Sequence, residues 1–143
     1  MSPPAAIDIH LFALKPDCAA IDPSSPRSPE STRLDVCDAD MRPFDVSMET
    51  LGEILAAQPR CYFEWDGSFV WTGDENGVTW TLSGMIYDTG QQISRVELRG
   101  TAPLEPVHRI VGWLSIPPRE LACQQILSGT FISGLELERL FRA

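Results

Sequence analysis

Residues 61–100 constrain the fold of this chain more than any other segment. Apolar and polar residues alternate there in four runs, 61–66, 68–72, 78–87 and 91–100, which turn-forming residues separate. Alternation with a period of two is typical of strands that bury one face, and short turns containing Gly join such strands into hairpins. The segment therefore predicts a four-stranded antiparallel meander over about 61–100.

The turns between these runs set the expected pairing of the strands. A two-residue turn at Asp66-Gly67 pairs Tyr62 with Trp71, and loops over 73–77 and 88–90 bring the remaining apolar residues onto one face. The expected core face holds Phe63, Trp65, Val70, Trp80, Leu82, Ile86, Val96 and Leu98. The last loop ends in a Gly with positive φ, so we expect Gly90→Val to destabilise the fold more than Gly73→Val.

The same registers place three aromatic residues on the opposite, polar face: Tyr62, Phe69 and Trp71. Arg95 and Arg99 follow on this face as rim charges. Three interpretations remain open: another part of the chain covers the aromatic residues, two copies meet there in a homodimer, or the patch forms a ligand or peptide groove. Aromatic residues are enriched in interface cores, and a two-fold axis lets such a patch meet itself.

Other segments predict one further strand and several helices. Residues 7–14 alternate as a further strand, which is a candidate for addition to the sheet. Ser47 is a good N-cap for a helix over about 48–58, and Pro59 ends it. Helices are also predicted over 104–114, 118–127 and 134–142. Each segment has an apolar stripe, and each starts with Pro residues or with a capping box. The fold class expected is α+β, with the helices covering one face of the sheet.

A segment rich in Pro and Ser at 22–33 is predicted to be a flexible loop, because its composition cannot build a core. The four Asp residues between 34 and 45 lack the fixed Gly and terminal Glu of an EF-hand loop, and a solvated acidic loop is expected there. At 143 residues, the chain is expected to form a single domain over 1–143.

Charge excludes some partners. The formal net charge is −9. Binding to nucleic acid or to an anionic membrane surface needs clustered Lys and Arg, so neither is expected. No run approaches the length of about 18 apolar residues that a membrane span requires. An acidic balance suits a basic partner, although it is also common in cytosolic proteins.

Cysteine and histidine offer little for metal binding. The four Cys are far apart, no CxxC occurs, and the chain has two His, so neither a metal nor another cofactor is expected. The first residues show no basic region followed by an apolar one. We therefore expect a cytoplasmic protein with reduced thiols.

No motif for catalysis is present. The chain contains no GxSxG, Walker loop or GxGxxG, and its Cys61 has no His nearby in sequence.

The size and acidity of the chain resemble those of class I type III secretion chaperones, and this resemblance implies a small α+β dimer. The four consecutive strands expected here depart from the split sheet of that family. The sequence favours a non-enzymatic protein-interaction module, adaptor- or chaperone-like and homodimeric; a small-ligand-binding protein or an enzyme of another type is the alternative.

Overall fold

The computed structural model describes residues 3–18, 33–34 and 36–141. The strands in this part of the chain are β1 (Ala5–Leu14), β2 (Arg33–Leu34), β3 (Met41–Arg42), β4 (Cys61–Phe63), β5 (Ser68–Glu75), β6 (Val78–Thr89), β7 (Gln92–Ala102), β8 (Leu121–Gln125) and β9 (Phe131–Ser133). The helices are α1 (Met48–Ala56) and α2 (Leu104–Trp113), with 3₁₀ segments η1 (Pro16–Cys18), η3 (Asp38–Asp40), η4 (Pro118–Glu120) and η5 (Gly134–Phe141). An α+β architecture is confirmed.

All described strands join one antiparallel sheet in the order β2-β9-β8-β1-β7-β6-β5-β4, with β3 paired to the end of β1. The predicted meander is present as β4 to β7, but these are only four of the nine described strands of the sheet. β1 is a central strand between β7 and β8, whereas the sequence predicted at most an addition to the meander. Most of the predicted loop at 22–33 lies outside the described residues, and Arg33 belongs to β2.

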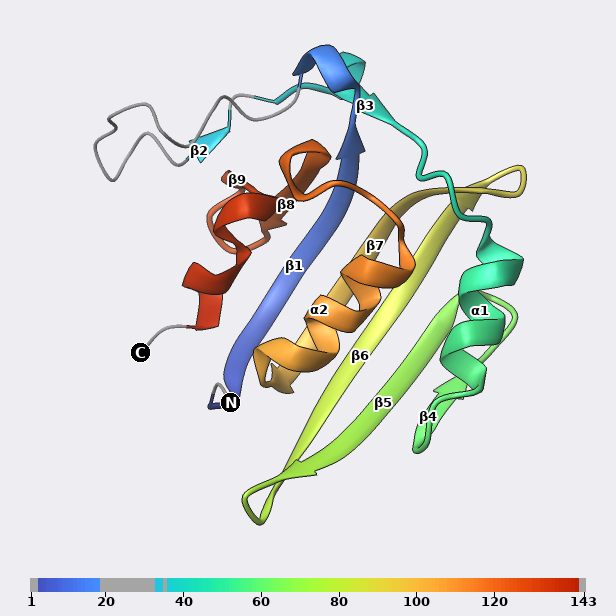
Figure 1. Ribbon diagram of the computed structural model, residues 1–143, viewed down its shortest axis with the longest axis vertical. Helices are drawn as coiled ribbons and strands as arrows, with labels where there is room; N and C mark the ends of the chain where they lie inside the picture. The colour runs from blue at the N-terminus through green and yellow to red at the C-terminus, as the bar shows by residue number, and fades with distance from the viewer. Residues whose placement is uncertain (1–2, 19–32, 35, 142–143) are drawn as a thin grey trace.

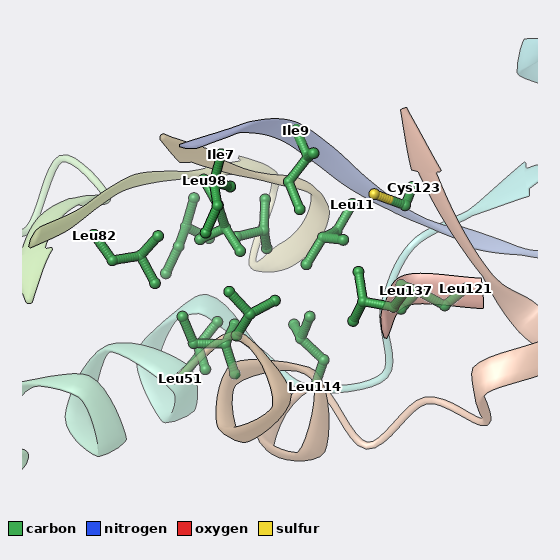
Figure 2. Packing of buried hydrophobic residues seen from close by; sticks show 14 of the residues in the cluster. Ile7, Ile9, Leu11, Leu51, Leu82, Leu98, Leu114, Leu121, Cys123 and Leu137 are labelled. Atoms are coloured by element: carbon green, nitrogen blue, oxygen red, sulfur yellow. The ribbon is translucent and has the colours of Figure 1, made fainter. Parts of the chain in front are cut away.

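Both α-helices cover the same face of the sheet, and the hydrophobic core lies between them and the strands (Figure 1). Figure 2 shows Leu51 of α1 and Leu114 at the end of α2 beneath Leu82, Leu98 and the aliphatic residues of β1. Ser47 caps α1 as predicted, since its hydroxyl accepts the Thr50 N–H at 3.1 Å. The other face of the sheet carries no α-helix from the described residues and is called the open face below.

The predicted helix over 118–127 is wrong. Pro117 and Pro118 begin only the short η4, and the chain then continues as β8, which pairs with both β1 and β9. Leu121, Ala122 and Cys123 are all buried because both sides of this strand are covered. A short apolar run reads equally well as a helix until its neighbours are known. The predicted helix over 134–142 is the 3₁₀ segment η5.

The predicted registers of the meander are also wrong. The β4–β5 connection spans four residues, so Tyr62 pairs with Val70 instead of Trp71. Asn76 and Gly77, with φ of 52° and 79°, form a two-residue turn where a five-residue loop was expected. Positive φ at both central residues is the mark of a type I′ hairpin turn. β5 therefore continues to Glu75, and its side chains face the opposite way from the prediction.

The faces of β6 and β7 are as predicted, although their pairing is shifted. Gly90 and Gln91 join the strands. The partner of Val96 is Ile86, whereas the sequence predicted Leu82. A bulge after Tyr87 adjusts the ladder near the turn. The shift is an even number of residues and leaves the predicted core residues of these strands on the helix-covered face: Trp80, Leu82, Ile86, Val96 and Leu98.

Candidate functional site

The structure separates the residues predicted to form an exposed aromatic patch. Tyr62 lies on the open face with 74% of its surface exposed, but Phe69 and Trp71 are only 2% and 4% exposed. Both lie on the helix-covered face, because β5 is turned over relative to the prediction. Trp71 stacks on Trp113 of α2, with ring centroids 5.6 Å apart, and meets Trp80 edge-on at 5.7 Å. Phe69 and Trp71 are therefore core residues, and their assignment to the open face is wrong.

A smaller group of apolar residues is exposed around the β4–β5 edge of the sheet, with Tyr62 and Val70 on the open face and Trp65 on the side of α1, and we call it the edge patch. Tyr62 and Val70 are direct cross-strand partners on the open face. Trp65, which the sequence placed in the core, is 77% exposed in the β4–β5 connection, and Val70 is 40% exposed. The indole of Trp65 packs edge-on against Phe63, with ring centroids 5.9 Å apart. This contact gives the exposed Trp65 ring a rigid support.

A shallow groove of about 230 Å³ runs beside the edge patch, and we call it the acidic groove. Its lining residues are Met48, Glu49, Trp65, Asp88 and Gln91. Nearby, the Ser68 hydroxyl and backbone N–H donate to Asp66 at 2.6 Å and 2.9 Å, which holds the pKa of that carboxyl below its usual range. An aromatic ring flanked by carboxylates is an environment that attracts a cation.

A polar cluster occupies the middle of the open face, where β1, β6 and β7 lie side by side. One Glu97 carboxylate oxygen contacts the His10 ring at 3.0 Å and accepts the Tyr87 hydroxyl at 3.1 Å. The other oxygen accepts from Arg99 at 3.2 Å, and Arg99 also lies 3.6 Å from Asp8. Arg99 is therefore on the open face as predicted, but it is held by carboxylates of its own chain.

Arg95 is also on the open face as predicted, one row along β7 from Glu97. Its guanidinium carbon lies 3.9 Å from the centroid of the Tyr87 ring. Its Nε is buried without a hydrogen-bond partner, and no described carboxylate pairs with it. A pocket of about 420 Å³ lies against this side chain. Among the described residues, Arg95 thus differs from Arg99 in having an aromatic ring, and no ion-paired carboxylate, in contact with its guanidinium.

The described residues offer little for nucleophilic or metal chemistry. Burial raises the pKa of the Cys61 thiol to about 11 and that of Cys123 to about 12, so neither is a thiolate at neutral pH. No group of three or more His, Cys, Asp or Glu in the described part of the chain is arranged to hold a metal ion. The Asp40 carboxylate accepts the Cys37 N–H at 2.9 Å and serves to close η3.

Three residues of the open-face polar cluster were not among the site residues predicted from sequence: His10, Tyr87 and Glu97. His10 and Glu97 are 87 positions apart, and only the pairing of β1 with β7 brings them together. The local signal available was the row of Asp8, His10 and Phe12 on the non-core side of the predicted strand 7–14. That row indicates a polar cluster only once β1 is known to be a central strand. A central strand has neighbours on both sides whose side chains can contact the row, whereas an edge strand has a neighbour on one side only.

No helix in the described part of the chain is long and apolar enough to cross a membrane. Comparison of the chain with protein-family models, with curated proteins and with solved structures finds no match.

Proposed function

We propose that this chain is a non-enzymatic protein-interaction module that contacts its partner through the edge patch. The observation that carries this proposal is the exposure of two large aromatic side chains, Tyr62 at 74% and Trp65 at 77%, at one edge of the sheet. Trp and Tyr are the residues that most often dominate binding energy at interfaces, and Trp65 already has the rigid support of Phe63.

The acidic groove indicates the chemistry of the partner. Glu49 and Asp88 line the groove together with Trp65, and the chain as a whole carries a net charge of −9. A Lys or Arg of a partner would lie against the Trp65 ring and between these carboxylates, where cation–π attraction and charge pairing act together. We therefore expect a partner surface with an apolar anchor for the edge patch and basic residues beside it.

A homodimer, the partner expected from sequence, is a less favourable occupant of this surface. Without Phe69 and Trp71 the patch is smaller, and a stable interface buries about 800 Å² on each partner. A two-fold interface at this edge would also bring carboxylates of one acidic groove toward those of its copy, and like charges that meet at an interface are costly. The edge patch thus suits a basic partner better than a second copy.

Selection of peptides from a random display library on the wild-type protein would test the proposal. Bound peptides should be enriched in Lys or Arg next to an apolar residue, and added salt should weaken their binding. Trp65→Ser should weaken it by about 2 kcal/mol or more, the loss typical of an interface hot spot. Leu127→Ser is the matched control, because Leu127 is 96% exposed on the β8–β9 turn, far from β4 in the strand order.

Equal binding to wild type and Trp65→Ser would rule out the edge patch as the contact surface. Light scattering after size-exclusion chromatography tests the homodimer separately. A dimer that Trp65→Ser converts to a monomer would make a second copy the partner, whereas a monomer at every concentration would eliminate the homodimer.

A further inference from the structure

A second recognition feature lies elsewhere on the open face, where the end of β1 meets β3 and the β6–β7 hairpin (Figure 1). It is the pocket of about 420 Å³ beside Arg95, whose volume is in the range of small-molecule sites. Its lining is partly apolar and partly charged: Phe12, Asp38, Met41, Arg42, Pro43, Thr89, Gln92, Ser94 and Arg95. It shares no lining residue with the acidic groove.

The charges around the pocket are unevenly balanced. Arg42 is fully engaged, because it donates to the Leu14 carbonyl at 3.1 Å and pairs with Glu120 at 3.1 Å. Arg95 has no such partner among the described residues, and its Nε is buried without a hydrogen bond. Asp38, the one carboxylate among the lining residues, lies on the exposed segment η3, where water screens its charge, whereas the half-buried Arg95 contacts the Tyr87 ring and creates a positive potential in the space beside its guanidinium. That potential favours an anion.

The rest of the lining suits an apolar group. Phe12 presents an aromatic ring that is itself held by Phe131, with centroids 5.9 Å apart. Met41 and Pro43 supply aliphatic surface, and a Met side chain adapts readily to the shape of a ligand. A cavity with an aromatic wall, an adaptable Met and a cation that has no ion-pair partner among the described residues has the composition of a site that binds small organic molecules.

We propose that this pocket binds a small organic anion, with its carboxylate beside Arg95 and its apolar body against Phe12 and Met41. Arg is well matched to a carboxylate, because its planar guanidinium presents several donors to the two oxygens. The proposal does not depend on the edge patch.

Titration of ¹⁵N-labelled protein with benzoate, followed by NMR, tests it. A fragment of this size should bind with a Kd on the order of 1 mM, and it should shift the amide signals of Phe12, Met41 and Ser94 together. Benzamide has the same ring without the charge, and inorganic phosphate has charge without the ring. Each should bind about tenfold more weakly than benzoate.

Two variants locate the site independently. Arg95→Met should weaken benzoate binding about tenfold, whereas Arg119→Met, an exposed Arg of η4 outside the pocket, should leave it unchanged. Met41→Trp fills the pocket without altering charge and should also abolish binding, so it decides the matter if Arg95→Met does not fold. The proposal is overturned if benzamide or phosphate binds as tightly as benzoate, if no signal shifts, or if Met41→Trp, with an unchanged melting temperature, still binds.

Discussion

Gly73→Ala gives a direct measure of the β5–β6 register. In the structure Gly73 pairs with Trp80, and the indole covers the place where a Cβ would be. A Cβ built on Gly73 would lie 2.3 Å from Cζ2 and 2.4 Å from Cε2 of Trp80. Carbon atoms in contact are about 3.5–4.0 Å apart, so the indole must move by more than 1 Å.

The cost follows from the burial of that ring. A buried Trp removes about 150–250 Å² from water. At about 25 cal/mol per Å², losing half of that area costs roughly 2–3 kcal/mol. For a chain of this length, such a loss lowers the melting temperature by roughly 5–10 °C. Gly73→Ala should also remove the near-ultraviolet circular dichroism signal of the Trp71–Trp80 pair, whose rings are 5.7 Å apart.

Two other Gly residues serve as controls in the same thermal melts. Gly90 has φ of +66° with no atom near its missing Cβ, so Gly90→Ala should cost only the left-handed conformation, about 1–2 kcal/mol. Gly112 lies in α2 with open space around it, and Gly112→Ala should stabilise by about 0.5–1 kcal/mol. The order expected for these Ala variants of Gly73 and Gly90 is thus the reverse of the order that the sequence predicted for the Val variants. A Gly73→Ala variant that unfolds like wild type and keeps its dichroism would refute the observed register.

Three further predictions concern other parts of the fold. Gly100→Ala should prevent folding or destabilise severely, because its Cβ would lie 2.2 Å from the Thr81 carbonyl oxygen and its φ is +136°; a soluble variant with wild-type stability in urea would contradict this. Burial raises the pKa of Cys61 to about 11 and of Cys123 to about 12. The folded state therefore prefers the neutral thiols, and their stabilising contribution, complete below the unfolded pKa near 9.0, should be lost as pH rises through 11–12. Above pH 9, the melting temperature of a Cys61→Ala, Cys123→Ala double variant should therefore fall less with pH than that of the wild type. Ser47→Ala should cost about 1 kcal/mol by removing the N-cap of α1, and helical circular dichroism on denaturation would measure the loss.

Local sequence determined the helix ends and the alternation of side chains along the strands, because both depend on residues that are close together in the chain. Ser47 and Pro59 bracket α1 because a cap and a helix breaker act within one turn of chain. The apolar stripe that predicted a helix over 104–114 is realised as α2. Alternation in β6 and β7 assigned Trp80, Leu82, Ile86, Val96 and Leu98 to the core, because side chains on a strand alternate whatever its partner.

Tertiary structure decided the rest, because the deciding contacts join residues far apart in the chain. A strand can satisfy its backbone hydrogen bonds in either of two orientations, and the length of one turn at Asn76-Gly77 turned Trp71 inward and Val70 outward. The run 121–125 became a strand because β1 and β9 offered hydrogen bonds on both sides. The pairing of β1 with β7 brought His10 to Glu97. Sequence periodicity thus predicted which side chains of a strand share a face, whereas the face that is buried, the partner of each strand and the exposed surfaces followed from packing of the whole sheet.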